Sequence, residues 1–86
     1  MKYRIVGVKS KRPKVNRWHE LVTGKLCTIE SLEPGESGWL VIEGIAYRDW
    51  PTQFHTSPVI GTTEKDGVLT IETANSVYTL KMEGLL

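Results

Sequence analysis

VIGTTEKDGVLTIETANSVYTLKM, residues 59–82, alternates apolar and polar side chains with a period of two, which predicts β-strands. Its segments 59–64, 68–73 and 77–82 are rich in Val, Ile, Leu, Thr and Tyr, residues that favour strands. Asp66-Gly67 separates the first two segments and predicts a tight hairpin, because glycine tolerates positive φ. Asn75, in the second connection, can adopt a left-handed conformation. We therefore predict a three-stranded meander.

The remainder of the chain continues the β pattern. Segments 3–8, 26–32 and 39–43 are further predicted strands, and one proline and two glycines within 33–38 favour a hairpin between the last two. No window has a helical stripe, so the chain is predicted to be all-β. The alternation assigns these residues of the meander to the core: Leu69, Ile71, Tyr78, Leu80 and Met82.

The third predicted strand differs from the others because Trp39-Leu40-Val41-Ile42 is apolar on both faces. Leu40 and Ile42 compete with Trp39 and Val41 for the core. The strand is either covered on both sides or presents one face to a partner.

Two long connections interrupt the strands. Residues 9–24 form a basic loop that begins with polar residues and ends in a segment that packs, where Asn16 is a candidate cap for a single helical turn. Residues 45–58 form an aromatic loop around Pro51. The order of strand, basic loop, hairpin, aromatic loop and meander predicts one domain, residues 1–86. Its fold is a small, partly open antiparallel barrel of about five to six strands.

This layout resembles barrels of Src-homology-3 type, in which a long loop after the first strand precedes a run of short antiparallel strands. The resemblance covers strand spacing and includes no residue-level motif, so it implies a fold and no function.

Composition restricts the class of protein. Hydrophobic residues are 40% of the chain and charged residues 24%, as in globular domains. No stretch approaches the length of a membrane helix and the first apolar run is too short for a secretory signal, so we expect a soluble, cytoplasmic protein. Cys27 is the single cysteine, either a buried inert thiol or a nucleophile. His19 and His55 have no recognisable metal-ligand spacing, so we expect no metal and no cofactor.

Charge is segregated along the chain. Residues 1–25 contain eight basic residues and one acidic residue, a net charge of +7, whereas residues 26–86 contain three basic and nine acidic residues, a net charge of −6. Such asymmetry indicates a basic arm that meets nucleic acid or an acidic partner.

The first candidate binding site lies in the basic loop. Five cations fall within nine residues and are followed directly by an aromatic residue; together the candidates are Lys9, Lys11, Arg12, Lys14, Arg17 and Trp18. Cations that contact phosphates beside a ring that stacks on a base are typical of nucleic-acid binding. The same residues suit an acidic protein surface. A third interpretation is a solvated loop that pairs with the acidic part of the same chain.

The second candidate site lies in the aromatic loop and consists of Tyr47, Arg48 and Trp50. Tyrosine, tryptophan and arginine are enriched at interface hot spots. The alternative is that Trp50 and Phe54 cover the end of the barrel. We expect Phe54 to act as such a lid and Trp50 to be the exposed anchor.

Catalysis has little support in the sequence. No nucleophile elbow, phosphate-binding glycine loop or catalytic carboxylate spacing occurs, and the pair His55 and Ser57 has no orienting acid, so we predict no enzyme and no catalytic residue. The favoured hypothesis is a non-enzymatic binding module for nucleic acid or for a protein that handles it. One alternative is a small inhibitor or adaptor of phage or mobile-element type that binds a host protein, for example a nucleic-acid defence enzyme. Another is a homo-oligomeric structural subunit, with a two-fold homodimer as the commonest form.

Overall fold

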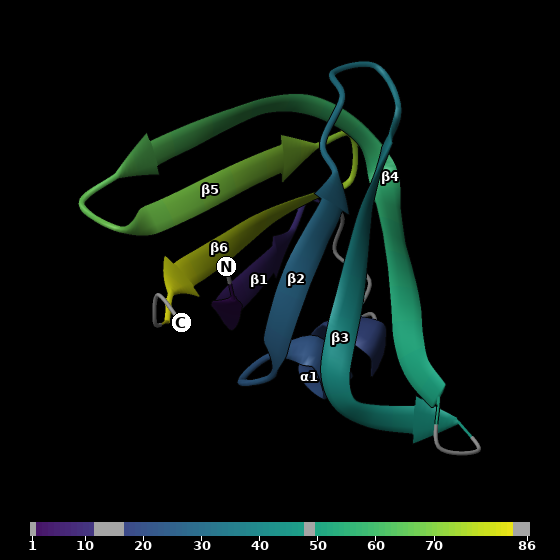
Figure 1. Ribbon diagram of the computed structural model, residues 1–86. Helices are drawn as coiled ribbons and strands as arrows, with labels where there is room; N and C mark the ends of the chain where they lie inside the picture. Colours follow the sequence, from purple (N-terminus) through teal and green to yellow (C-terminus); the bar gives the residue numbers. More distant parts are fainter. Residues whose placement is uncertain (1, 12–16, 48–49, 84–86) are drawn as a thin grey trace.

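The computed structural model describes residues 2–11, 17–47 and 50–83; for residues 17, 18, 44–47 and 50–52 it describes the backbone alone. One short helix lies among strands, in the order β1 (Tyr3–Ser10), α1 (Arg17–Val22), β2 (Leu26–Ser31), β3 (Ser37–Tyr47), β4 (Trp50–Lys65), β5 (Val68–Thr73) and β6 (Ser76–Met82). Each strand pairs antiparallel with the next and β6 returns to β1, so the strands form a closed barrel (Figure 1). The predicted all-β class and the small barrel of Src-homology-3-like layout are confirmed, and strand pairing closes the ring.

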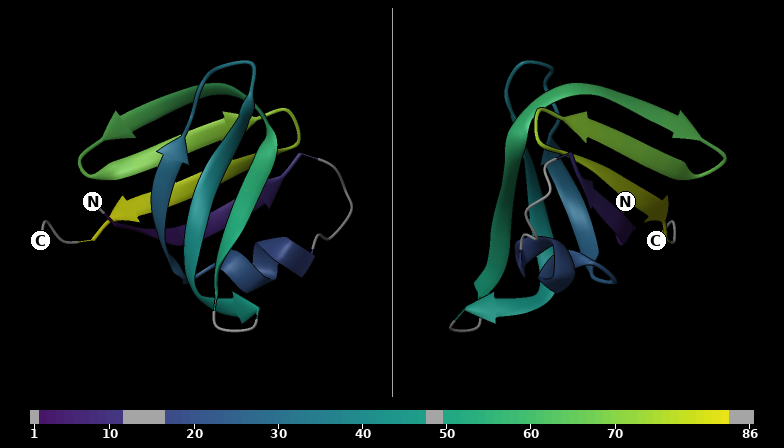
Figure 2. Two further views of the ribbon diagram at one scale, coloured as in Figure 1. Left: turned by 45° about the vertical axis from the view of Figure 1, so that its right-hand side comes forward. Right: turned by 180° about the vertical axis from the view of Figure 1, so that it is seen from behind.

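β4, with 16 residues, is the longest of the described strands. It pairs first with β3 and then with β5, so it connects two layers of the barrel, one that contains β2 and β3 and one that contains β5 and β6. Residues 50–58 pair with β3 and residues 59–65 pair with β5, with a register shift between Val59 and Gly61. Figure 2 shows β4 curving from the β2–β3 layer over to β5. The irregularity bends the strand where it passes from one partner to the other.

The prediction that residues 45–58 form an aromatic loop is wrong for the part of this segment that the structure describes. Residues 45–47 complete β3 and residues 50–58 begin β4, while the predicted Arg48 lies outside the described residues. From residue 53 the side chains alternate as in a strand: Gln53 and His55 are exposed, Phe54 is half-buried and Thr56 is buried. Pro51 and Pro58 obscured this pattern, because proline cannot donate to a ladder and is tolerated only at edges and irregular positions.

The core contains the predicted alternating residues. Leu69, Ile71, Tyr78 and Leu80 are buried, whereas Met82 is half-buried at the end of β6. In β3, Leu40 and Ile42 are fully buried and Trp39 is 40% exposed, so the first pair faces the interior. The remaining buried hydrophobic residues of the core cluster are Ile5, Val22, Cys27 and Val59.

The two hairpin turns of the meander are closed in different ways. Asp66 and Gly67 have φ of 52° and 78°, and two successive positive values are the signature of the tight hairpin turn that Asp-Gly predicts. Among the described residues other than glycine, only Asp66 has positive φ. The prediction of a left-handed conformation at Asn75 is therefore wrong. The β5–β6 turn is instead closed by Thr73, whose Oγ1 accepts from the Ser76 amide at 3.0 Å and donates to the Ser76 carbonyl at 2.9 Å.

The predicted basic loop, residues 9–24, is partly regular structure. β1 extends to Ser10, and α1 provides the helical turn and the packing segment that the sequence predicts. Val22 is the residue of α1 that enters the core. Asn16, the predicted cap, lies outside the described residues, as do the binding candidates Arg12 and Lys14.

Candidate functional site

Both ends of the basic segment are attached to the barrel. At the first end, the Lys11 amide donates to the Asn75 carbonyl at 2.8 Å. At the other end, α1 contacts β1 and β3, and the Gly24 amide that follows it donates to the Ile5 carbonyl at 2.6 Å. The intervening residues therefore join two fixed points on the barrel.

Of the predicted cations in this segment, two have described side chains. Lys9 is exposed on β1, opposite Val77 of β6. Lys11 is also exposed, and its Nζ lies 2.7 Å from Glu72 Oε2. Lys11 therefore pairs with an acid of its own chain, as in the third interpretation of the basic loop.

Ion pairs connect the two oppositely charged parts of the chain at further places. Lys2 Nζ lies 2.7 Å from Glu43 Oε1, and Arg4 Nε lies 2.8 Å from Glu83 Oε1. With the Lys11 pair, every ion pair of the described residues joins the basic first segment to the acidic remainder. Exposed pairs of this kind are worth about 0–1 kcal/mol each, so they leave most of the charge available to a partner.

α1 is held to the barrel by a small aromatic and polar cluster. His19 Nε2 lies 3.3 Å from Ser76 Oγ, and the His19 ring meets Tyr78 edge-on at 6.0 Å. Tyr78 makes a second edge contact with Phe54, also at 6.0 Å, so Phe54 packs against the core as the sequence predicts for a lid. Burial lowers the pKa of His19 and raises the pKa of Tyr78. The cluster favours a neutral imidazole that packs.

The two predicted binding segments lie at the same end of the barrel. α1 contains Arg17 and Trp18 and contacts β3, the strand that ends at Tyr47. Tyr47 pairs with Trp50 at the tip of the β3–β4 hairpin, and Figure 2 shows this tip and α1 on the same side of the molecule. The side chains of these four residues lie outside the described part, so the structure shows only that their backbone segments lie on the same side of the molecule.

Sequence reasoning missed a second group of cations, on the outer face of the barrel. Arg4 pairs with Lys81, Lys81 with Val68, and Val68 with Lys65, so these residues form one row across β1, β6, β5 and β4. Lys65 and Lys81 are exposed. They are two strands apart, about 10 Å at typical strand spacing. The alternation within 59–82 already assigned Lys81 to the outer face, but the row itself depends on strand register.

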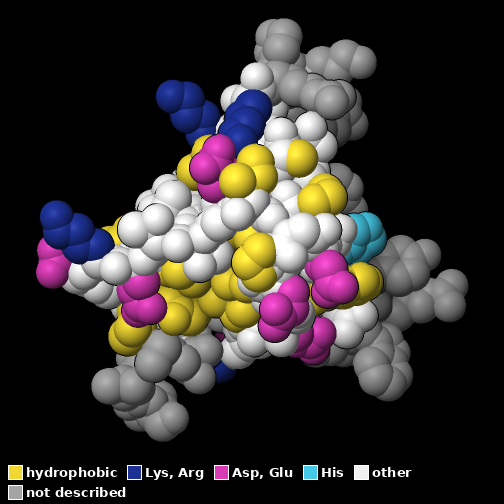
Figure 3. All heavy atoms as spheres, turned by 90° about the horizontal axis from the view of Figure 1, so that it is seen from above, with side chains coloured by type: hydrophobic (Ala, Val, Ile, Leu, Met, Phe, Trp, Pro, Cys, Tyr) yellow, Lys and Arg dark blue, Asp and Glu magenta, His cyan; other side chains and the backbone are white. Residues whose placement is uncertain are grey.

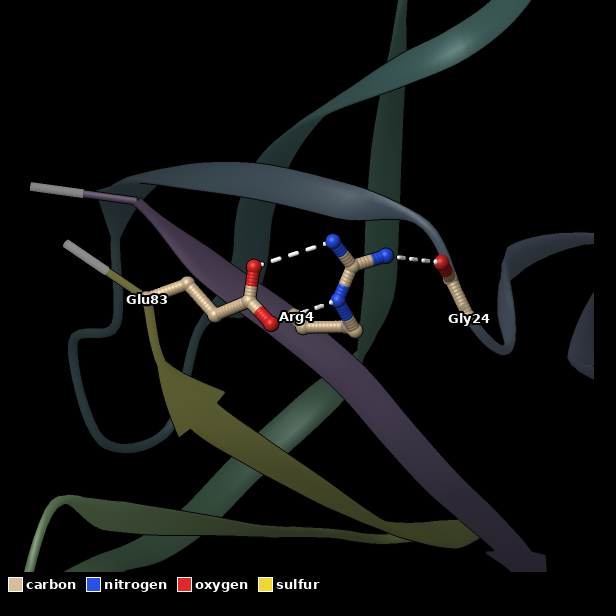
Figure 4. Close-up of polar contacts among 3 residues, drawn as sticks. All are labelled: Arg4, Gly24 and Glu83. Carbon is tan, nitrogen blue, oxygen red and sulfur yellow. Dashed lines mark hydrogen bonds and ion pairs between the residues drawn. The ribbon is translucent and has the colours of Figure 1, made fainter.

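Arg4 in this row is engaged within the protein. Its guanidinium is bidentate on Glu83, with distances of 2.8 and 2.9 Å, and its Nη1 donates to the Gly24 carbonyl at 2.7 Å (Figure 4). The hydrogen bonds to Glu83 raise the pKa of Arg4, and those from Arg4 lower the pKa of the Glu83 carboxyl. The contact joins β1, the end of β6 and the turn before β2.

Trp39 and His55 form an exposed aromatic pair on the outer face of β3 and β4. Their ring centroids are 5.0 Å apart and the rings are tilted by 44°. Residues 39–42 of β3 are apolar on both faces, and the exposed face is therefore the one that contains Trp39. His55 packs on Trp39, and Ser57 Oγ accepts from Asn75 Nδ2 at 2.6 Å, so His55 and Ser57 have separate structural partners.

The described residues offer little for metal or thiol chemistry. They contain no group of three His, Cys, Asp or Glu side chains placed to hold a metal ion. Cys27 is buried, and burial raises the pKa of its thiol to about 11, which suits the inert interpretation. In the same part of the chain, no helix is both long and apolar enough to cross a bilayer.

Comparisons with protein-family models, curated proteins and solved structures found no match to this chain.

Proposed function

We propose that this chain is a non-enzymatic binding module that docks on nucleic acid through its basic loop, residues 9–24, and the neighbouring tip of the β3–β4 hairpin. The observation that carries the proposal is the attachment of the basic segment at both ends, through Lys11 to Asn75 and through α1 to the barrel. A segment with fixed ends loses less conformational entropy on binding than a free arm. Its cations can then contact phosphates at a lower ordering cost.

The charge of the loop and its aromatic neighbours supports nucleic acid over an uncharged partner. The net charge of +7 in residues 1–25 exceeds what the described ion pairs neutralise. Trp18 in α1 and Trp50 in β4 belong to backbone segments at the same end of the barrel, where rings could stack on unpaired bases. The row that contains Lys65 and Lys81 adds positive charge on a separate face.

The test is a mobility-shift titration with short single-stranded and duplex DNA and RNA at low salt. We expect binding whose logarithm falls with the logarithm of salt concentration by roughly 0.7–0.9 per phosphate contact. The double variant Lys11→Glu with Arg12→Glu should weaken binding strongly. The matched control, Lys65→Glu with Lys81→Glu, makes the same change in net charge away from the loop and should have the smaller effect.

Two outcomes contradict the proposal. The absence of binding to every one of these nucleic acids at low ionic strength excludes direct recognition and leaves a protein partner. Equal weakening by the two double variants indicates attraction to total charge and not to the loop.

A further inference from the structure

The outer face of the layer formed by β2, β3 and the first half of β4 has an exposed aromatic pair at its centre. Trp39 is 40% exposed in β3, the middle strand, and His55, its register partner in β4, is also exposed. The centroids of the two rings are 5.0 Å apart. An exposed indole that packs on a neighbouring ring offers its free face to another flat group.

β2 contributes a carboxylate on the other side of this indole. The β2–β3 ladder has one extra residue in β2 at this point, so Glu30 and Ser31 are together opposite Trp39. Ile29 packs against the core, whereas Glu30 is exposed, so the Glu30 side chain is on the outer face with the ring. Side chains opposite one another on one face of a sheet are about 5 Å apart at Cβ. Trp39 therefore has an imidazole on one side and a carboxylate on the other.

The charge around the aromatic pair is acidic. Residues 26–47 contain four glutamates and no aspartate, lysine or arginine. Glu33 and Glu36 are in the β2–β3 turn, and the Glu36 carbonyl accepts from the Val59 amide at 2.9 Å, so the turn is fixed to β4. From the side of this turn, Figure 3 shows acidic side chains gathered beside hydrophobic side chains and a histidine.

Most of this acidic charge is not neutralised within the described part of the chain. Glu43 pairs with Lys2 at 2.7 Å, but no ion pair of the described residues includes Glu30, Glu33 or Glu36. A cation complements such a surface, and tryptophan is the ring to which cations are most strongly attracted. The face therefore combines two features that favour a positively charged ligand.

Arginine is the cation that fits this combination best. Its guanidinium is planar, stacks on aromatic faces and donates two parallel hydrogen bonds to a carboxylate. The ammonium of lysine is a more strongly hydrated point charge and does not stack. A ring beside a carboxylate therefore distinguishes the two cations.

We propose that Trp39, His55 and Glu30 bind an arginine side chain from a basic segment of another protein. The guanidinium stacks on the exposed face of the Trp39 indole and donates to the Glu30 carboxylate, while further cations of the segment meet the acidic β2–β3 turn. The site goes beyond the function proposed above, because it uses a layer of the barrel whose charge is opposite to that of the basic loop.

The same charges argue against two other occupants. Nucleic acid would bring its phosphates against Glu30 and the acidic turn. A second copy of this chain could offer its own basic segment only head to tail, because the two surfaces differ, and such contacts form rings or open filaments and not the common two-fold dimer. Both occupants are outcomes of the experiment below.

The experiment uses two labelled, end-blocked peptides of equal length and charge, one of alternating serine and arginine and one of alternating serine and lysine. Each is titrated into the full chain at low salt and followed by fluorescence anisotropy. We expect the arginine peptide to bind at least about threefold more tightly than the lysine peptide. In NMR spectra, it should shift the resonances of the Trp39 indole and of the Glu30 and His55 amides.

Substitutions of the indole test the contact with the ring. Trp39→Leu keeps an apolar side chain without a ring and should weaken binding of the arginine peptide by about fivefold or more. Trp39→Phe keeps a ring and should weaken binding less. Circular dichroism of both variants confirms that they are folded.

Substitutions of glutamate test the contact with the carboxylate. Glu30→Gln removes one negative charge beside the ring and should weaken binding by about threefold or more. Glu64→Gln is the matched control, because it removes the same charge from an exposed position in the part of β4 that pairs with β5. Its binding should stay within about twofold of the wild type.

Several results overturn the proposal. Absence of binding by the arginine peptide removes the site. Equal affinity of the two peptides, or binding unchanged in Trp39→Leu, indicates ionic attraction alone. A single-stranded oligonucleotide that shifts the Trp39 indole resonance assigns the face to nucleic acid, and self-association that Trp39→Leu abolishes assigns it to a second copy.

These measurements are separate from the test of the basic loop. Trp39→Leu should bind nucleic acid as the wild type does. The double variant Lys11→Glu with Arg12→Glu should bind the arginine peptide at least as tightly as the wild type, because it removes positive charge that repels the peptide. Failure of one proposal therefore leaves the other standing.

Discussion

The two sides of β1 are closed by different means. Its ladder with β6 runs from Tyr3 to Ser10, whereas its ladder with β2 is confined to Tyr3 and Arg4. At the short ladder, the Arg4 side chain joins Glu83 after β6 to Gly24 before β2. The barrel is therefore closed by backbone and core packing on one side, and largely by a connecting turn and an ion pair on the other.

The β6 side should show the largest loss when its packing is removed. Leu80 is fully buried in β6, between Ile5 of β1 and Leu69 of β5 in the register. Leu80→Ala should lower the free energy of unfolding by about 2–5 kcal/mol, because a cavity adds to the lost burial. Chemical denaturation measures this loss. The neighbouring exposed Lys81→Ala should change stability by less than about 0.5 kcal/mol. Similar losses for the two variants would contradict the assignment of Leu80 to the core.

The next largest loss of stability is expected at Gly38 of β3, which lies beside Thr56 and Val59, where β4 changes its partner from β3 to β5. A Cβ at Gly38 would lie 3.0 Å from Leu32 Cδ2, 3.1 Å from Thr56 Oγ1 and 3.3 Å from Val59 Cγ2. The Gly38 amide also donates to the buried Thr56 Oγ1 at 2.9 Å. Gly38→Ala should therefore destabilise the protein by about 1–3 kcal/mol, because the neighbours must shift.

Gly7→Ala is the matched control for this prediction. Gly7 is also in a strand, and a Cβ there would meet nothing within 4 Å. Its stability should be unchanged or rise by up to about 1 kcal/mol, since alanine restricts the unfolded chain. Thermal unfolding of the two variants side by side decides the matter. A Gly38→Ala protein as stable as Gly7→Ala would show that the bend accepts a side chain.

The sequence predicted those parts of the fold that depend on local pattern. Alternation assigned Leu69 and Leu80 to the core, and Asp66-Gly67 specified its turn through local backbone conformation. The extended segment that begins β4 was missed, because its ladder is irregular at Pro58, where β4 changes partners. That change is a tertiary property, which no window of sequence expresses.

The candidate sites divide in the same way. Clustered cations such as Lys9 and Lys11 are visible in the sequence. The row that joins Lys65 to Lys81 depends on register between strands distant in the chain. The sequence left undecided whether Lys11 pairs with an acid of its own chain, because its partner Glu72 lies 61 residues away and is brought near by the fold.

The smallest effect on global stability is expected at the short ladder, where the Arg4 contact is partly exposed to solvent. Arg4→Ala should mainly speed amide exchange of Lys25, which follows Gly24, and of Cys27, which is opposite Tyr3 in the short ladder, while exchange in β6 changes little. The reason is that the variant removes the side-chain connection at a junction with little backbone pairing. Arg4→Lys is the control: it keeps the charge but not the bidentate geometry, so its exchange should be intermediate. Unchanged exchange in Arg4→Ala would show that the turn alone holds the junction.

The same junction should depend on pH. The folded protein lowers the pKa of the Glu83 carboxyl below its ordinary value of 4.5, chiefly through the hydrogen bonds from Arg4. The stabilisation of the junction by the Arg4–Glu83 contact is therefore fully present above pH 4.5. It is lost as the pH falls through the lowered pKa of Glu83. After correction for the intrinsic pH dependence of exchange, protection of Lys25 and Cys27 should fall in that acidic range in the wild type. In Glu83→Gln it should be lower at neutral pH and lack this step. A step that persists in Glu83→Gln would assign the acid sensitivity to another carboxylate, because the glutamine cannot titrate.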